Sequence, residues 1–428
     1  MAYPIRNIEP AEFPAFTAVL EQAFNSNWPA EPAREHVRGT FEFDRSAAAF
    51  DADQIAGTAC NFTFRLAVPG GTVAAAGISA VAVLPTHRRR GIMSALIRYL
   101  IADALGRGEP VAVLWAAEPE IYGRFGFGCA TRRLSYAIPH GEARLVPPPL
   151  PAAGDAAGSG GTAGAGPGGP LRLRIADPAK LHGELAAVYG PVAATRPGAL
   201  ARDDRWWHVM TDDPEWAREG AAPLRCLLAE DDRGPRGYAL YAGRPTWGDD
   251  GIAANQLTVR ELVAADPGAE FALWSDLLSR DLVSEVRVAD RPVDDPLLHL
   301  LAGPRRARAR LADGLWVRLA DVPAALRQRR YCRDVDVVLE VIDSELPANA
   351  GPWRLQAGAG EPARCEPAPA GSAEVTLTVQ ALGAAYLGGP SLAALAAAGQ
   401  VAASRPAALT ALSMAMSWDP APWCPVDF

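Results

Sequence analysis

An apolar strand that stops at a proline and runs into a basic turn is the feature that most constrains the fold of this chain. The strand covers residues 78–84, Pro85 ends it, and the turn at 87–91 carries three arginines and Gly91. A helix with one apolar face follows, shown by a spacing of three and four between Met93, Leu96, Ile97, Leu100, Ile101, Ala104 and Leu105. A second buried strand comes next, at 111–115. Strand, helix and strand in this order predict an α/β domain.

The chain is long enough for two or three domains. It has 428 residues, of which 49% are hydrophobic, and one core rarely organises so many. Residues 147–170 are rich in Gly, Pro and Ala, and because they cannot bury enough apolar area to offset their ordering entropy, they are predicted to form a linker. Residues 171–304 repeat the α/β order of the first part. Residues 305–428, beginning with a strand at 315–319, combine strands with Ala-rich helices in an α+β pattern.

The second α/β part lacks the basic turn. At the corresponding place it reads Ala265-Asp266-Pro267-Gly268, with a carboxylate where a bound anion would lie. This part is therefore predicted not to bind phosphate.

Composition excludes several classes of function. The 41 Lys plus Arg and 49 Asp plus Glu give a net charge of −8 without a basic block, so neither nucleic acid nor an anionic membrane is an expected partner. The N-terminus lacks a secretory signal, and the apolar stretch 391–416 is broken by Gln400, Arg405 and Pro406, so we expect no membrane span and a cytoplasmic location. Histidines and cysteines lack ligand spacing, so no metal is expected.

The basic turn suits a pyrophosphate. The first turn of the following helix offers unpaired backbone N–H groups and a partial positive charge, and Gly91 allows a close approach. Arg88 and Gly91 match the R-x-x-G-x-[GA] coenzyme A loop of the GNAT acetyltransferase superfamily, whereas Met93 is bulkier than the last residue of that pattern. Taken alone, this motif also fits an exposed basic helix start without a ligand.

A second motif follows the strand at 111–115. Residues 116–128 read AAEPEIYGRFGFG. They resemble the GNAT element in which a short helix presents a tyrosine to the thioester and ends in a Gly-Phe turn. Together, THRRRG and IYGRFGFG resemble most closely the Eis-type (enhanced intracellular survival) N-acetyltransferases of actinobacteria.

The resemblance covers the full chain in layout. It implies an N-terminal GNAT domain at 1–146, a degenerate GNAT-like domain at 171–304, and a sterol-carrier-protein-like domain at 305–428. It also implies an N-acetyltransferase that uses acetyl-CoA as cosubstrate and acetylates an amine small molecule, such as an aminoglycoside or a polyamine. Members of the resembled family form hexamers, so a homo-hexamer is implied as well.

By the same resemblance, Tyr122 is the general acid, the terminal carboxylate of Phe428 is the general base, and Asp427 belongs to the substrate pocket. Acetyl-CoA would be held by the backbones of Val81, Ala82 and Val83, by a pyrophosphate cradle of Arg89, Arg90, Gly91, Ile92, Met93 and Ser94, and by Ala117 and Glu118. The chemistry agrees, because a phenol with a pKa of about 10 keeps its proton at neutral pH and an α-carboxyl with a pKa of about 3.3–3.7 does not. The resembled family has further acidic residues in its substrate pocket. These have no match here, because residues 24–28 carry side-chain amides and no carboxylate.

Other interpretations stay open at this point. Tyr122 could only pack on the coenzyme, and the tail that ends at Phe428 could only close the third domain. A lipid carrier or binding protein would fit the sterol-carrier-like part but would leave the basic turn unexplained. A protein-lysine acetyltransferase would use the same N-terminal residues with a more open cleft.

Overall fold

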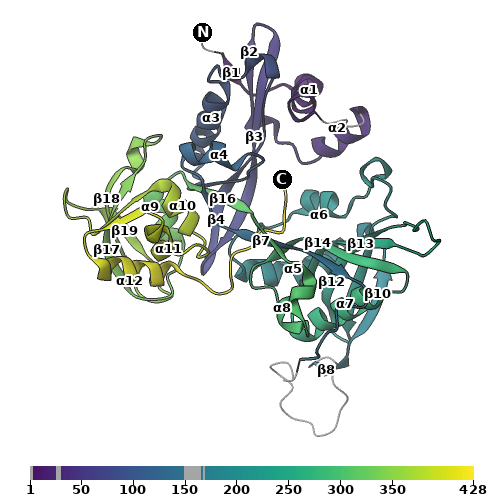
Figure 1. Ribbon diagram of the computed structural model, residues 1–428. Helices are drawn as coiled ribbons and strands as arrows, with labels where there is room; N and C mark the ends of the chain where they lie inside the picture. The colour runs from purple at the N-terminus through teal and green to yellow at the C-terminus, as the bar shows by residue number, and fades with distance from the viewer. Residues whose placement is uncertain (1–2, 26–29, 149–164, 167–168) are drawn as a thin grey trace. The chain divides into compact units, whose positions relative to one another are not determined.

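The structure, a computed structural model, describes residues 3–25, 30–148, 165–166 and 169–428 (Figure 1). It divides into two compact units. The first combines Met1–Arg132, Thr195–Ala201 and Asp313–Phe428, and the second combines Arg133–Ala194 and Arg202–Ala312. Most of the linker expected at 147–170 lies outside the described residues. At its end the short strands β8 (Ala165–Gly166) and β9 (Gly169–Pro170) pair with each other.

The first unit is built on a seven-stranded sheet. In sheet order, its strands are β1 (Ile5–Arg6), β2 (Ser46–Asp51), β3 (Gln54–Val68), β4 (Gly71–Val83), β5 (Val111–Trp115), β16 (Leu315–Leu319) and β6 (Gly128–Cys129). Only the β4–β5 pairing is parallel among these recorded pairings. The strands expected at 78–84 and 111–115 are thereby confirmed as parts of β4 and β5.

Helices cover both faces of this sheet. Figure 1 shows α3 (Ile92–Gly106) and α1 (Phe13–Phe24) on opposite sides of β3, with α2 (Ala30–Arg38) next to α1. The apolar face of α3 is buried as its spacing predicted. It packs on alanines and other small apolar residues of the strands in a cluster that we call the α3-side core, formed mainly by Ala47, Ala49, Ala56, Ala59, Ala76, Ile78, Ile92, Leu96, Ile97, Leu100, Ile101 and Ala112.

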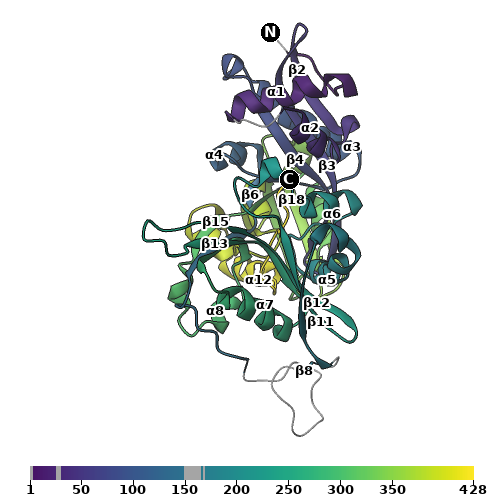
Figure 2. The same cartoon turned by 90° about the vertical axis from the view of Figure 1, so that its right-hand side faces the viewer.

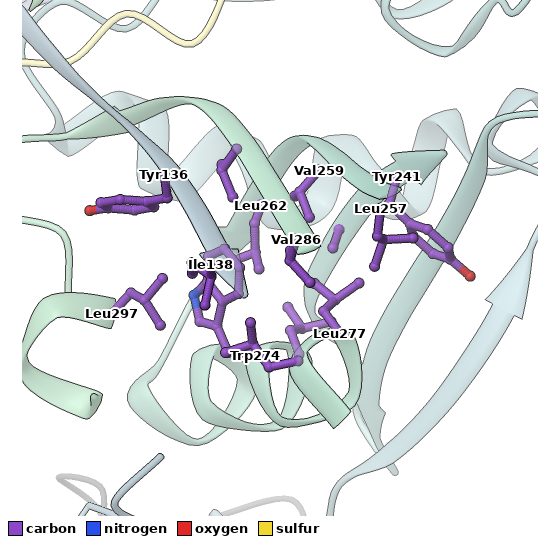
Figure 3. Packing of buried hydrophobic residues seen from close by; sticks show 14 of the residues in the cluster. Tyr136, Ile138, Tyr241, Leu257, Val259, Leu262, Trp274, Leu277, Val286 and Leu297 are labelled. Carbon is purple, nitrogen blue, oxygen red and sulfur yellow. The ribbon is translucent and has the colours of Figure 1, made fainter. Parts of the chain in front are cut away.

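The second unit repeats this plan. Its sheet runs β10 (Arg172–Ala176), β11 (Arg225–Asp231), β12 (Gly234–Arg244), β13 (Asn255–Ala264), β14 (Val283–Pro292), β7 (Arg132–Pro139) and β15 (Arg310–Asp313). Its helices are α5 (His182–Thr195), α6 (Asp204–Thr211), α7 (Pro267–Ser279) and α8 (Leu297–Leu300). Figure 3 shows Trp274 and Leu277 of α7 pointing toward Ile138 of β7 and Val286 of β14 in its core.

The two sheets exchange strands. The strand 315–319, expected in the third domain, instead pairs with β5 of the first sheet from Leu315↔Trp115 to Leu319↔Val111. Conversely, β7 comes from the first part of the sequence and pairs with β14. Periodicity reveals that a segment is a strand, but it does not reveal which neighbouring strand it pairs with. The domain boundaries expected at 146 and 304 stay predictions.

The C-terminal part of the first unit forms a mixed five-stranded sheet with helices, which confirms the α+β pattern. Its strands, in sheet order, are β19 (Arg364–Pro367), β18 (Gly351–Ala357), β17 (Val335–Ile342), β20 (Val375–Thr378) and β21 (Val401–Ala403). The helices are α9 (Val322–Gln328), α10 (Val379–Ala385), α11 (Leu392–Ala397) and α12 (Pro406–Met416). Within the described residues, no helix is both long enough and apolar enough to cross a bilayer.

Candidate active site

A wedge opens between the two parallel strands of the first sheet. β4 and β5 pair at Ala75↔Val111, Ala76↔Ala112 and Gly77↔Val113, and the recorded pairing ends there. Beyond this point Trp115 of β5 pairs with β16 on its other side, while β4 continues along β3 to Val83. Past Gly77, β4 is therefore paired with β3 and no longer with β5.

A β-bulge lies in β4 along this wedge. The register between β3 and β4 shifts between Thr58 and Cys60, and Ala80 takes a left-handed φ of 53°. The buried hydroxyl of Thr58 donates a hydrogen bond of 3.0 Å to the carbonyl of Ala80 and so holds the bulge. The bulge consists of Ala80 and Val81 opposite Ala59, so it includes the first of the residues expected to contact the pantetheine arm, Val81, Ala82 and Val83. No sequence signal marks it, because neither alanine nor threonine favours this conformation.

The basic turn and the helix start have the features of an anion site. A 3-10 helix, η3 (Pro85–His87), leads into the turn, and Gly91 is the N-cap of α3 with a φ of 82°. No heavy atom lies within 4 Å of the place where a Cβ of Gly91 would be. Arg89 and Arg90 are exposed beside it, and the backbone N–H groups of Ile92, Met93 and Ser94 form the first helical turn.

Two contacts anchor this turn. The ring of His87 is buried, with Nε2 3.1 Å from a carboxylate oxygen of Asp51 at the end of β2. Arg90 donates a hydrogen bond of 3.1 Å to the Tyr3 hydroxyl. Met93, the departure from the coenzyme A pattern, is half-buried and packs against the α3-side core, so its bulk is accommodated by the protein's interior.

Tyr122 ends the short helix α4 (Pro119–Tyr122), which begins soon after β5. Its side chain is 8% exposed, belongs to the α3-side core together with Ile92, and meets the Phe127 ring edge-on at 6.2 Å. Burial, and then the charge of Glu118, raise the pKa of the Tyr122 phenol, which favours the protonated form that a general acid needs. Ala117 and Glu118 are exposed just before the helix.

The end of the chain lies at the apex of the wedge. The ring of Phe428 stands 4.9 Å from that of Phe64 and 6.4 Å from that of Phe62, both on β3. A Cβ on Gly77, the last β4 residue paired with β5, would overlap Cε2 of Phe64 and lie 3.0 Å from Cε2 of Phe428, so the close approach of these rings requires glycine here. Figures 1 and 2 both show the chain end beside β3 and β4. Asp427 is exposed next to it.

Tyr122 and Phe428 lie on opposite faces of the first sheet. Tyr122 belongs to the α3-side core, and the side chain of Asn61 on β3 also faces α3, because it donates to the Leu100 carbonyl. Side chains alternate along a strand, so Phe62 and Phe64, against which Phe428 packs, lie on the other face. The structure thus places the residue expected as the acid and the end of the chain on the two faces of the first sheet.

Contacts that the sequence did not predict hold the tail in place. The indole Nε1 of Trp115 donates a hydrogen bond of 2.8 Å to the Val426 carbonyl. Arg196 donates to the Ala421 carbonyl at 2.7 Å, although the sequence order places Arg196 in the second α/β part. Such contacts between distant segments leave no local pattern in the sequence.

In the second sheet, side chains of the same unit fill the corresponding place at the end of the parallel strands β13 and β14. The parallel pairing of β13 and β14 ends at Val259↔Val288. Beyond it, buried Arg291 donates to the Leu262 carbonyl of β13 and pairs with Asp295 and Glu270. Burial raises the pKa of Glu270.

The N-terminus of α7, which corresponds to that of α3, is also occupied by a side chain of the protein. The side chain of Asp266 accepts the N–H of Ala269 at the start of α7 and pairs with Arg236 at 2.9 Å. This carboxylate lies at the helix start, where the first sheet has Gly91, and the absence of phosphate binding by the second part stays a prediction.

Two other expectations concern residues away from the wedge. Of the segment 24–28, the structure describes Phe24, the last residue of α1, and Asn25, its C-cap, whereas 26–28 lie outside the described residues. In the part of the chain that the structure describes, no three His, Cys, Asp or Glu side chains gather as a metal site would require.

Comparison with known proteins identifies the domains and the family. Residues 4–130 and 198–319 each match an acetyltransferase (GNAT) domain, and residues 322–425 match a sterol carrier protein domain. An N-acetyltransferase of Streptomyces avermitilis, described as uncharacterized, is 41% identical over 429 residues, covering all of both chains. The N-acetyltransferase Eis of Mycobacterium bovis is 36% identical over 353 residues, covering 81% of this chain and 79% of that protein.

Solved structures agree. The crystal structure of Eis1 from Mycobacterium abscessus aligns with a TM-score of 0.79 at 32% identity, covering 99% of this chain and all of that one. A GCN5-related N-acetyltransferase from Anabaena variabilis, at 20% identity and a TM-score of 0.82, shows the same fold over the full length of both chains. The chain therefore belongs to the Eis-type N-acetyltransferases of the GNAT superfamily.

Proposed function

We propose that this chain moves the acetyl group of acetyl-CoA to a primary amine of a polycationic small molecule, an aminoglycoside or a polyamine. Tyr122 is the general acid and the α-carboxylate of Phe428 is the general base. The observation that carries the proposal is the packing of Phe428 against Phe64 beside Gly77, because it puts the chain end at the opening between β4 and β5.

The wedge and the start of α3 fit acetyl-CoA. The backbone at residues 81–83, past the β4–β5 pairing, suits the amides of a pantetheine arm, and the exposed arginines and Gly91 at the helix start suit a pyrophosphate. Ala117 and Glu118, exposed beyond β5, would lie further along the same ligand. When bound, acetyl-CoA supplies its acetyl group as a thioester, whose C–S bond is replaced by an amide C–N bond.

Two groups of the chain accept and donate the protons during acetyl transfer. The carboxylate of Phe428 takes the proton that the attacking amine must lose, directly or through a water. The Tyr122 phenol, whose pKa is raised by burial, gives its proton to the departing sulfur. A backbone N–H near Val83, beside the bulge, would stabilise the charge that develops on the carbonyl oxygen. The two groups lie on opposite faces of the first sheet, which suits an amine and a thioester arriving from opposite sides.

A cationic acceptor agrees with the charge near the chain end. Asp427 adds a second carboxylate next to that of Phe428, and the chain as a whole carries a net charge of −8. The sterol-carrier-like part offers less for a lipid: a groove of about 550 Å³ on its sheet is lined mainly by charged and polar side chains, among them Asp336, Arg354, Arg364, Glu366, Glu374 and Arg405. The homo-hexamer and the cytoplasmic location stay predictions, and light scattering of the purified protein tests the first.

Thiol release measured over a panel of aminoglycosides, polyamines, a lysine peptide and a lipid tests the acceptor class. We expect turnover with the first two groups, and turnover with the peptide alone would assign a protein-lysine acetyltransferase instead.

A one-residue extension after Phe428 tests the base. It should suppress acetyl transfer and leave the affinity for coenzyme A unchanged, with an N-terminally tagged protein, whose C-terminus is verified by intact mass, as the active control. Normal turnover by the extended chain would eliminate Phe428 as the base.

A further inference from the structure

The last three residues of the chain are held at both ends. The Val426 carbonyl accepts the 2.8 Å hydrogen bond from the indole of Trp115, and two residues later the Phe428 ring packs on Phe64. Only the torsions of Asp427 and Phe428 lie between these two points. The indole therefore limits where the α-carboxylate can be.

Trp115 is well placed to give such support. It is the last residue of β5, where its backbone pairs with Leu315 of β16, and its side chain is half-buried. The same strand pairs with Gly77 through Val113, so the tail and one wall of the wedge share a rigid element. A functional group supported by sheet structure is held more tightly than one on an unsupported loop.

The tail is also fixed upstream by residues 195–201, which we call the clasp. Trp423 donates its N–H to the Pro197 carbonyl at 2.8 Å, and Ala67 of β3 bonds to the clasp through Ala199 and Gly198, both at 2.8 Å. The clasp therefore ties the tail to the strand that carries Phe64. Downstream of the clasp, the Val426 carbonyl also accepts a 3.3 Å bond from Cys424 Sγ within the tail, and the Trp115 indole links this carbonyl to the sheet.

We propose that Trp115 is a positioning residue for acetyl transfer, acting through the Val426 carbonyl to hold the Phe428 carboxylate at the wedge. The inference rests on the proposed role of that carboxylate as the base. A base must lie within hydrogen-bond reach of the proton it takes, so displacement of the last residues by about 1 Å would slow the reaction without changing how acetyl-CoA binds.

The substitution Trp115→Phe tests this, because it removes the N–H donor and keeps an aromatic ring. Trp316→Phe is the matched control: Trp316 is also half-buried in the first sheet and its indole donates a 2.8 Å bond, but to Asp313 and not to the tail. Trp115→3-benzothienylalanine, which replaces the indole N–H by sulfur at constant size, covers the case in which phenylalanine disturbs folding. Melting temperature and coenzyme A affinity are measured for each variant.

We expect Trp115→Phe and the isostere to lower kcat by about 10- to 100-fold while the KM for acetyl-CoA stays unchanged. The deficit should shrink as the pH rises from about 7 to about 9.5, because more acceptor amine is then already deprotonated and needs no base. Carboxypeptidase should also release Phe428 faster from these variants. Trp316→Phe should match the wild type in all three measurements.

The chain extended after Phe428, assayed in parallel, separates two kinds of failure. If the extended chain is slow and both Trp115 variants turn over normally, the positioning role is refuted and the carboxylate keeps its role as base. If the extended chain is as active as the wild type, the proposed base itself is refuted. A kcat deficit in the Trp115 variants that does not change with pH would also overturn the inference, because it would indicate a general structural defect.

Discussion

The hydroxyl of Thr58 donates a 3.0 Å hydrogen bond to the carbonyl of Ala80, an alanine held at a φ of 53° in the middle of a strand. A left-handed backbone costs an alanine roughly 1–2 kcal/mol, so the surrounding structure must hold it in place. The bulge directs the run of backbone that we propose for the pantetheine arm. Thr58, remote from any motif, thus contributes to the shape of the site.

Thr58→Val should therefore raise the KM for acetyl-CoA by about 2- to 13-fold, the equivalent of one hydrogen bond of roughly 0.5–1.5 kcal/mol. Thr58→Ser keeps the donor and should behave as the wild type in steady-state kinetics. Ala80→Gly, which accepts the left-handed backbone without a steric cost, should restore part of the loss when combined with Thr58→Val. Equal KM values for the Val and Ser variants would show that the hydrogen bond does not shape the site.

Tyr122→Phe should leave coenzyme A affinity unchanged and lower kcat by about 10²–10⁴, the usual range for a lost general acid. Because burial raises the pKa of Tyr122 above its usual value, the wild type should show no loss of kcat from ionisation of this group up to about pH 10. Calorimetry and a kcat profile against pH provide the two measurements. An unchanged kcat in the variant would reduce Tyr122 to a packing residue.

Coenzyme A should bind with a stoichiometry of one per chain, although two GNAT domains are present. The second sheet fills its wedge with Arg291 and its helix start with Asp266, whereas Gly91 leaves the first helix start open. Gly91→Glu should abolish binding, because it places a carboxylate at the helix start and a side chain on a residue with a φ of 82°. Calorimetric titration of both proteins decides this, with circular dichroism as the folding control. A stoichiometry of two would show that the second domain also binds.

The free energy of unfolding should fall at alkaline pH, because buried tyrosines keep their protons in the folded chain and lose them in the unfolded chain. Tyr331 and Tyr386 are fully buried and donate to the carbonyls of Leu326 and Ala325, and burial raises the pKa of both phenols far above the usual value of about 10. Above pH 10 the unfolded chain loses these protons and the folded chain keeps them. The free energy of unfolding should therefore be at its full value below about pH 10 and decrease above it, by up to about 1.4 kcal/mol per pH unit for each tyrosine.

Urea denaturation between pH 8 and 11.5 measures this dependence. Tyr386→Phe, which cannot ionise, should show a shallower decrease than the wild type over the same range. Identical slopes for the two proteins would mean that Tyr386 already ionises in the folded state.

The sequence by itself determined many of the local elements and indicated the family. The apolar spacing after Gly91 predicted α3, because a helix that packs on a sheet needs one apolar face, and the strand 111–115 was located to the residue. The basic turn and the residues around Tyr122 indicated the family, since binding a pyrophosphate and protonating a thiolate require particular residue types at particular places in the chain.

Only the tertiary structure decided which segments meet. That β16 joins the first sheet, that Thr58 holds the bulge at Ala80, and that Trp115 holds Val426 are contacts between residues far apart in the chain. A strand pattern specifies which side chains face a core but leaves the pairing partner open. The pairing depends on the free energy of the whole assembled sheet, so these relationships have no counterpart in any local stretch of the sequence.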